Sequence, residues 1–336
     1  MKKIVVIGGG VVGCLSAINL KEKGFQVSIL DQSEIGQESS LAAAGILFPL
    51  LPWDYDDSIY QLCMNSDRSY ESLSKRLIDE TGCDPEFKKS GMLLKQKNDR
   101  QLMSEWSTRN NFNIEERKLD NNPYFYFPEV CQISPSKLMK ALKKLMVNLK
   151  IEIIENCKLT PIKSENKKIF EWPSNNNQLI SADFYVIATG AWTGLIHQKF
   201  LDHIYPVRGQ MIQFKKNDIE LPHIFYGDNS YVLQRKDGVI LAGSTRENVG
   251  FSKAINREAI SMLQKKAQNL VPKLKDIELE KHWTGFRPGT NENLPFIMKD
   301  NFYENLFINS GHYRYGITMA PESANRITEL IMQEGA

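Results

Sequence analysis

The sequence is poor in cysteine and has no long apolar run. Its 336 residues include five cysteines, an odd number, and none of them shows the C-x-x-C spacing of a zinc or redox site. We therefore expect neither a disulfide framework nor a metal site, and a cytoplasmic location. No stretch approaches the roughly 20 apolar residues that span a bilayer, so we expect no membrane anchor.

A strong excess of one charge is also missing. Lys and Arg number 42 against 40 Asp and Glu, a formal net charge of +2, which argues against nucleic acid or a membrane surface as a partner. The composition, 42% hydrophobic and 24% charged, is ordinary for a globular protein with a sizeable core. The start of the chain, Met1 to Cys14, imitates a lipoprotein signal, but its glycines weaken any signal helix, so we expect it to fold.

The first 31 residues combine two strands, a glycine-rich turn and a helix. Lys3–Ile7 is a short apolar run, typical of a buried parallel strand. A G-x-G-x-x-G sequence follows at Gly8–Gly13, and apolar residues then recur at helical spacing from Val11 to Lys23. A second apolar run, Phe25–Leu30, ends at an acid. This order predicts a dinucleotide-binding unit.

Each part of this unit has a chemical task. Gly8 permits the tight turn out of the strand, Gly10 lets a pyrophosphate approach the backbone, and Gly13 lets the helix pack closely. Free N–H groups at the start of the helix, at Val11 and Val12, would face the phosphates. Asp31 stands where a carboxylate can accept hydrogen bonds from ribose hydroxyls.

The acid disfavours NADP but leaves both NAD and FAD open. In an NAD dehydrogenase further strand–helix units follow promptly, whereas Ser33–Gly45 is rich in small residues and has little periodicity. Small side chains let the backbone approach a flat ring system closely, which favours FAD.

Five segments in order carry a family pattern. They are Asp31–Gly45 (D-x-x-x-x-G followed by S-S-x-A-A-A-G), Tyr185–Trp192, Pro206–Gln210, Trp283–Thr290 and Gly311–Ile317. Together they resemble the D-amino acid oxidase family of FAD-dependent oxidoreductases, and within it the glycine oxidases. The resemblance runs from residue 4 to beyond residue 317.

The resemblance implies an α/β fold with a discontinuous arrangement. We expect a Rossmann-like FAD-binding domain of the glutathione-reductase type at residues 1–85, 132–206 and 290–336. An inserted α+β substrate domain, built on a mainly antiparallel sheet, would occupy residues 86–131 and 207–289. Short strands with hairpin-like connections between 211 and 283 suit such a sheet, and a helix from about 319 to 332 closes the chain. By analogy alone, the protein would be a homo-oligomer.

The resemblance also implies a set of contacts to non-covalently bound FAD. These are Gly8, Gly10, Val11, Val12, Gly13, Asp31, Gln32, Ser39, Ser40, Ala44, Gly45, Ile46, Leu159, His312, Tyr313, Arg314, Tyr315, Gly316, Ile317 and Thr318. The last seven belong to a segment that would act mainly through its backbone, so His312 is not expected to be a catalytic base.

A small amino acid presents a carboxylate, which a guanidinium grips bidentately. By resemblance Arg287, just before a Pro-Gly turn, binds that carboxylate, and Arg314 is a second substrate contact. Tyr231 aligns with an active-site tyrosine, and Tyr226 is a weaker candidate. Arg246 departs from the pattern: pointing inward it would suit a second carboxylate on the substrate, and pointing outward it would be a surface charge.

The activity implied is oxidation of glycine, sarcosine or a small D-amino acid. The α-hydrogen would leave as hydride to the flavin, giving an oxo acid, ammonia or an amine, and hydrogen peroxide, with oxygen as acceptor. A glycine oxidase role would suggest a link to thiamine biosynthesis. Four alternatives stay open: a D-amino acid dehydrogenase that uses a quinone or another acceptor, a 2-hydroxy acid oxidising flavoenzyme, a flavin-binding module without turnover, and an NAD dehydrogenase.

Overall fold

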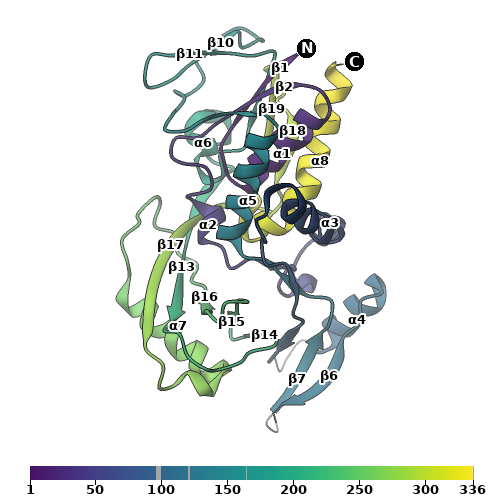
Figure 1. The fold of residues 1–336 in the computed structure, drawn as a ribbon, viewed down its shortest axis with the longest axis vertical. Helices are drawn as coiled ribbons and strands as arrows, with labels where there is room; N and C mark the ends of the chain where they lie inside the picture. Colours follow the sequence, from purple (N-terminus) through teal and green to yellow (C-terminus); the bar gives the residue numbers. More distant parts are fainter. Residues whose placement is uncertain (96–99, 120–121, 164, 336) are drawn as a thin grey trace.

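The computed structural model describes residues 1–95, 100–119, 122–163 and 165–335. These residues form two large sheets, one in the upper and one in the lower half of Figure 1, with helices packed against both. The two chain ends lie close together at the top of that view. Throughout these segments, no helix combines the length and the apolar character needed to cross a membrane.

Three of the α-helices, α3 (Asp57–Thr81), α5 (Pro135–Asn148) and α7 (Arg257–Leu270), begin with a clear start signal. The other α-helices of the described residues are α1 (Val11–Glu22), α2 (Ser39–Ala42), α4 (Arg100–Asn110), α6 (Thr193–Ile196) and α8 (Gly316–Gly335). Asp56 and Asn256 cap α3 and α7 by accepting backbone N–H groups of the first turn. Pro135 begins α5, where its missing N–H does no harm.

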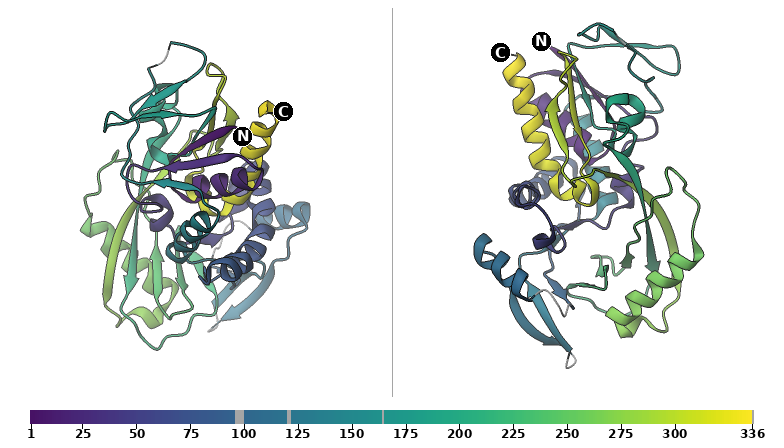
Figure 2. Two further views of the ribbon diagram at one scale, coloured as in Figure 1. Left: turned by 45° about the horizontal axis from the view of Figure 1, so that its top comes forward. Right: turned by 180° about the vertical axis from the view of Figure 1, so that it is seen from behind.

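The first sheet is parallel except at one edge. Its order is β18 (Phe296–Lys299), β19 (Leu306–Ser310), β12 (Phe184–Ile187), β1 (Lys3–Ile7), β2 (Gln26–Leu30) and β9 (Glu152–Ile154), and only the β18–β19 pair is antiparallel. Ile4 and Val6 pack with α1, α3, α5 and α8 on one face. Val5 and Ile7 pack on the other face with the hairpin of β10 (Glu171–Pro173) and β11 (Leu179–Ser181). Figure 2 shows α8 along this sheet from behind.

The second sheet separates a helix from a cavity. Its order is β17 (Leu279–Gly289), β13 (Tyr205–Phe214), β16 (Ile240–Gly243), β15 (Ser230–Gln234), β14 (Ile224–Gly227), β5 (Met92–Leu94), β7 (Asn122–Phe127) and β6 (Glu115–Leu119); only β14 and β5 are parallel. Ile212 and Phe214 pack against α7, while Met211 and Tyr231 belong to the core on the opposite face. The alternation of a strand thus gives α7 one face and the cavity the other.

A small third sheet lies where the chain passes between the two large ones. It consists of β3 (Ile46–Leu47), β8 (Cys131–Gln132) and β4 (Lys88–Lys89). It brings the segment after α2 next to the strand that precedes α5.

Two local predictions were wrong. The predicted turn at Pro288–Gly289 is part of β17, because β13 continues to pair with it as far as Tyr205. Helix α8 begins at Gly316, before the predicted start, and passes through Pro321. Proline cannot donate to the carbonyl four residues earlier. That carbonyl, on Ile317, accepts a hydrogen bond from Tyr70 instead, at 2.5 Å.

Candidate active site

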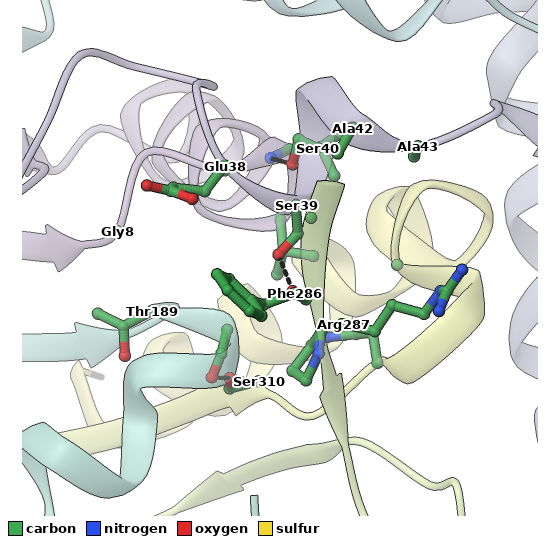
Figure 3. A pocket seen from close by; sticks show the side chains of 18 of the residues that line it. Gly8, Glu38, Ser39, Ser40, Ala42, Ala43, Thr189, Phe286, Arg287 and Ser310 are labelled. Carbon is green, nitrogen blue, oxygen red and sulfur yellow. Dashed lines mark hydrogen bonds between the residues drawn. The ribbon is translucent and has the colours of Figure 1, made fainter. Parts of the chain in front are cut away.

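A cavity of about 490 Å³ lies between the two large sheets. Its lining includes Gly8 and Asp31 at the ends of β1 and β2, and Met211, Tyr231 and Arg287 on the second sheet. Figure 3 shows Gly8 on one side of this pocket and Arg287 on the other. Residues far apart in the sequence therefore face one continuous space.

Two glycines shape the turn between β1 and α1. Gly8 has a φ of 110°, and a Cβ there would collide with the carbonyl of Ala188. A Cβ on Gly10 would make a tight contact with the Ser40 hydroxyl, at 3.2 Å, and Gly10 itself lines the cavity. Gly13 does not line the cavity: a Cβ there would collide with the Gly8 carbonyl, so its role is the close packing of α1 on β1.

The loop around this turn is fixed by side chains. The backbone N–H of Val11 donates to Ser40 Oγ at 2.9 Å. Asp31 accepts a hydrogen bond from Gly9 N at 2.6 Å through Oδ2, and one from Ser33 N at 2.8 Å through Oδ1. The carboxylate is therefore held in place at the edge of the cavity.

The small-residue segment that contains α2 is tied to the second sheet. The Ser39 hydroxyl donates to the carbonyl of Phe286, drawn as the dashed line in Figure 3. A Cβ on Gly285 would collide with Ala42, so the strand and the segment touch. The buried guanidinium of Arg235 donates to the carbonyl of Ala44 at 2.5 Å. These contacts set the backbone of this segment along the cavity wall.

Arg287 is a half-buried cation on the cavity wall. Its Nη1 donates to the carbonyl of Thr245 at 3.0 Å, and its Nη2 donates to Ser244 Oγ at 2.6 Å. Its guanidinium occupies the space that a Cβ on Gly209 of the neighbouring strand would fill. Burial lowers the pKa of Arg287, and the positive charge of Arg314 acts in the same direction. An arginine nevertheless stays protonated at neutral pH, and three of its five N–H donors remain for a ligand.

Arg314 is the second cation on the cavity wall. Its Nη1 donates to the phenol oxygen of Tyr55 at 3.3 Å. Burial acts to lower the pKa of Arg314, but the phenol groups around it raise the pKa more, so the net shift is upward. These phenols belong to Tyr55, Tyr226, Tyr231 and Tyr315.

The two arginines share one electrostatic property. Within the part of the chain that the structure describes, all hydrogen-bond acceptors of Arg287 and Arg314 are uncharged, and neither cation pairs with a carboxylate. A poorly solvated cation without a counter-ion is costly unless something compensates it. The wall therefore favours an anionic group in the cavity.

The aromatic candidates separate in the structure. Tyr231 lines the cavity, and its hydroxyl donates to Met211 Sδ at 3.0 Å. Tyr226 is buried outside the cavity lining, where its phenol bonds Arg314. Arg246 is exposed and does not line the cavity, so of the two orientations considered it takes the outward one.

His312 also lines the cavity but is engaged elsewhere. Its Nε2 lies 2.9 Å from Ser323 Oγ, within hydrogen-bond distance. Burial lowers the pKa of His312 to about 3, so the imidazole is neutral at neutral pH. As expected from the sequence, it is poorly suited to act as a general base.

Among the sequence-predicted site residues, Gly13 and the two weaker candidates Tyr226 and Arg246 do not line this cavity; the others do, and their contacts to FAD and substrate stay predictions. The residues that hold the cations, notably Tyr55, Ser244 and Thr245, were not predicted from the sequence. Gly209 was not singled out either, although it lies in the family-like segment Pro206–Gln210. The absence of a side chain at Gly209, which leaves room for Arg287, was the available signal.

The chain matches one known protein family over nearly its whole length. A family model described as FAD dependent oxidoreductase, with the short name DAO, matches residues 3–330. The glycine oxidase of Pseudomonas putida is 34% identical and that of Pseudomonas aeruginosa 31% identical, each over 98% of this chain and 94% of the relative.

Solved structures share the fold over nearly the whole chain. Glycine oxidase from Bacillus cereus has a TM-score of 0.89 at 24% identity, covering 99% of this chain and 96% of its own. Iminodiacetate oxidase from a Chelativorans species has a TM-score of 0.87 at 20% identity, covering 98% of this chain and 95% of its own. At these identities the likeness concerns the fold, and it extends to enzymes with different substrates.

Proposed function

Because the chain belongs to the DAO family of FAD-dependent oxidoreductases, we propose that it oxidises a small amino acid. The substrate is glycine, sarcosine or a small D-amino acid. The products are an oxo acid, ammonia or an amine, and hydrogen peroxide, with oxygen as the acceptor. A link to thiamine biosynthesis follows from the family resemblance and stays a prediction.

One observation carries this proposal: two cations without a carboxylate partner among the described residues border the same cavity. Arg287 presents free N–H donors in a planar fork, which suits a carboxylate. Arg314, in the short segment directly before α8, adds positive charge. An amino acid held by its carboxylate would keep its α-carbon in a fixed place, which supplies much of the catalysis.

The residues at the other end of the cavity fit FAD. Gly10 has no side chain and lines the cavity, so a pyrophosphate can approach the start of α1. Asp31 stands at the end of β2, in reach of a ribose. The segment from Ala42 to Gly45 offers a wall of small side chains to a flat ring. When bound, FAD accepts the hydride and passes the electrons on.

The protein's own side chains would orient the substrate. Arg287 and Arg314 would orient the carboxylate, and Tyr231 could turn its hydroxyl from Met211 to the substrate. His312 is a weak base, because burial lowers its pKa to about 3, and its Nε2 already lies within hydrogen-bond distance of Ser323 Oγ. The amine must therefore arrive neutral or release its proton to solvent.

The walls favour a small, uncharged substrate side chain. Phe48, Leu50, Met211 and Tyr231 line the cavity, and all four are bulky. Arg246 is exposed and supplies no third cation. We therefore place D-aspartate last among the substrates to test.

We also propose that the two large sheets belong to two domains. The sheet of β1 would be a Rossmann-like FAD-binding domain of the glutathione-reductase type, formed by residues 1–85, 132–206 and 290–336. The sheet of β13 would be the inserted substrate domain, formed by residues 86–131 and 207–289. The homo-oligomer and the cytoplasmic location stay predictions.

The test is anaerobic reduction of the purified, FAD-loaded protein. Glycine, sarcosine, D-alanine, D-proline and D-aspartate are added in turn, and the visible flavin absorption is recorded. Bleaching by glycine or sarcosine supports the proposal, and a flavin that none of the five bleaches rejects the substrate class. Readmitting oxygen and measuring peroxide then separates an oxidase from a dehydrogenase that uses a quinone.

A further inference from the structure

The carboxylate of Glu247 is linked to Arg287 through Thr245 and lies outside the cavity lining. Arg287 Nη1 donates to the carbonyl of Thr245, and the hydroxyl of Thr245 donates to Glu247 Oε1 at 2.5 Å. Glu247 does not line the cavity. It is therefore connected to Arg287 through a single residue and has no part in the lining itself.

Glu247 is paired with a different cation. Arg208, only 5% exposed, donates from Nη2 to Glu247 Oε2 at 2.5 Å. Gln210 Nε2 donates to Glu247 Oε1 at 2.8 Å. Two backbone hydrogen bonds, Arg208 N to Glu247 O at 2.9 Å and Glu247 N to Arg208 O at 3.0 Å, fix the two residues side by side.

The pairing keeps Glu247 ionised. Burial acts to raise its pKa, but hydrogen bonds from Arg208, Thr245 and Gln210 outweigh burial and lower the pKa. A full negative charge is thus linked to Arg287 through the two hydrogen bonds of Thr245, and without Arg208 it would oppose the positive field of Arg287.

We propose that Arg208 is a positioning and charge-balancing residue for the anion site: by neutralising Glu247 it lets that carboxylate fix Thr245 while the charge of Arg287 stays available to a ligand. The inference rests on the proposed function, in which Arg287 binds the substrate carboxylate. Glu247 supplies geometry, through Thr245, and Arg208 removes the electrostatic penalty of having a carboxylate there.

Two variants should change the affinity for a carboxylate ligand in defined directions. In Arg208→Gln, Glu247 is left without its cation, and binding of a carboxylate ligand weakens roughly tenfold or more. In Arg208→Gln/Glu247→Gln the exposed charge is gone, and binding recovers most of that loss. Both variants lack the bonds from Arg208 Nη1 to the carbonyls of Ser252 and Ala254, so their comparison isolates the charge of Glu247.

The experiment titrates sodium acetate into the FAD-loaded protein at constant ionic strength and neutral pH and follows the flavin absorption. Recovery of acetate affinity in the double variant supports the inference, and a double variant as weak as Arg208→Gln, or weaker, overturns it. If Arg208→Gln does not fold, Glu247→Gln alone decides: acetate binding as tight as the wild type or tighter supports charge balance, and weaker binding contradicts it.

Arg287→Met separates this inference from the proposed function. If acetate binds equally well without Arg287, the carboxylate role of that residue fails. If Arg287→Met abolishes acetate binding but the charge series shows no recovery, only the role of Arg208 and Glu247 fails.

Discussion

Arg314 donates a hydrogen bond to the phenol of Tyr55 at 3.3 Å, across 259 residues of sequence. Tyr55 also makes an edge-on contact with Tyr315, with ring centroids 5.4 Å apart. The ring contact survives in Tyr55→Phe, whereas the hydrogen bonds of the phenol with Arg314 and with the Tyr315 hydroxyl are lost. We expect a cost of about 1 kcal/mol to the placement of Arg314, seen as a roughly fivefold rise in the substrate KM.

Tyr205→Phe is the matched control for this variant. Its phenol bonds a backbone carbonyl, that of Thr290 at 3.4 Å, and does not line the cavity. Steady-state kinetics of both variants would count against a role for Tyr55 if their KM values rose equally.

Gly13→Ala should lower the stability of the protein, whereas Gly10→Ala should weaken FAD binding. Ala usually stabilises a helix interior by up to about 1 kcal/mol over Gly, but in Gly13→Ala the new Cβ collides with the Gly8 carbonyl. We expect Gly13→Ala to lower the free energy of unfolding by about 1–3 kcal/mol net.

Gly10→Ala adds its methyl group at the cavity wall, where its one neighbour within 4 Å is Ser40 Oγ, a tight contact at 3.2 Å. The FAD-free protein should therefore unfold at nearly the same urea concentration as the wild type, while FAD binds more weakly. Urea unfolding of both apoproteins, together with FAD titration, tests the pair. Equal loss of stability in both variants would contradict the assignment.

Arg235 should contribute strongly to the stability of the fold, although it does not line the cavity. Burial lowers its pKa to about 10, so it is a cation at neutral pH, and it bonds three oxygens, on Gln132, Ile133 and Ala44. In Arg235→Met the two backbone carbonyls lose a strong donor, at about 1–3 kcal/mol each, offset in part by removing a buried charge.

We expect the free energy of unfolding to be largest in the wild type, smaller in Arg235→Lys and smallest in Arg235→Met. Lysine keeps the charge but not the fork, so it should satisfy some of the acceptors. Chemical unfolding at neutral pH measures the order. A methionine variant more stable than the wild type would show that desolvation of the cation dominates.

The sequence predicted the parts of the fold that depend on local pattern. The strand Lys3–Ile7 has its predicted bounds. Arg287 and Arg314 were placed on the site by family-like segments, and both line the cavity. Periodicity and short motifs carry this information because each strand or turn is specified by adjacent residues.

Contacts between distant residues were not predictable in this way. Nothing around Tyr55 marks it as the partner of Arg314, and Arg235 has no motif that points to Ala44. Pro288–Gly289 was predicted to be a turn, whereas Pro288 lies in β17, an edge strand, where a missing N–H is tolerated. Its pairing with Pro206 depends on the register of β13, which a single sequence does not reveal.

Acid should destabilise the protein in two separate pH windows. Burial lowers the pKa of His312 to about 3, against its ordinary value of 6.5. For Asp300, burial acts to raise the pKa, but hydrogen bonds from His197 and two backbone N–H groups lower it to about 2, against 3.8. Both groups bind protons more readily when unfolded, so both contributions are lost as the pH falls, below about 6.5 for the histidine and below about 3.8 for the carboxylate.

The upper window therefore belongs to His312 and can be tested by one substitution. Between pH 6 and pH 4 the free energy of unfolding should fall by about 1.4 kcal/mol per pH unit from this group alone. Glutamine at this position can keep a bond to Ser323 Oγ but does not titrate, so His312→Gln should remove most of that slope. Urea unfolding of the FAD-loaded protein at several pH values, with His282→Gln as the control because His282 is exposed, measures it. An unchanged slope in His312→Gln would mean that the imidazole takes up its proton without leaving the native structure.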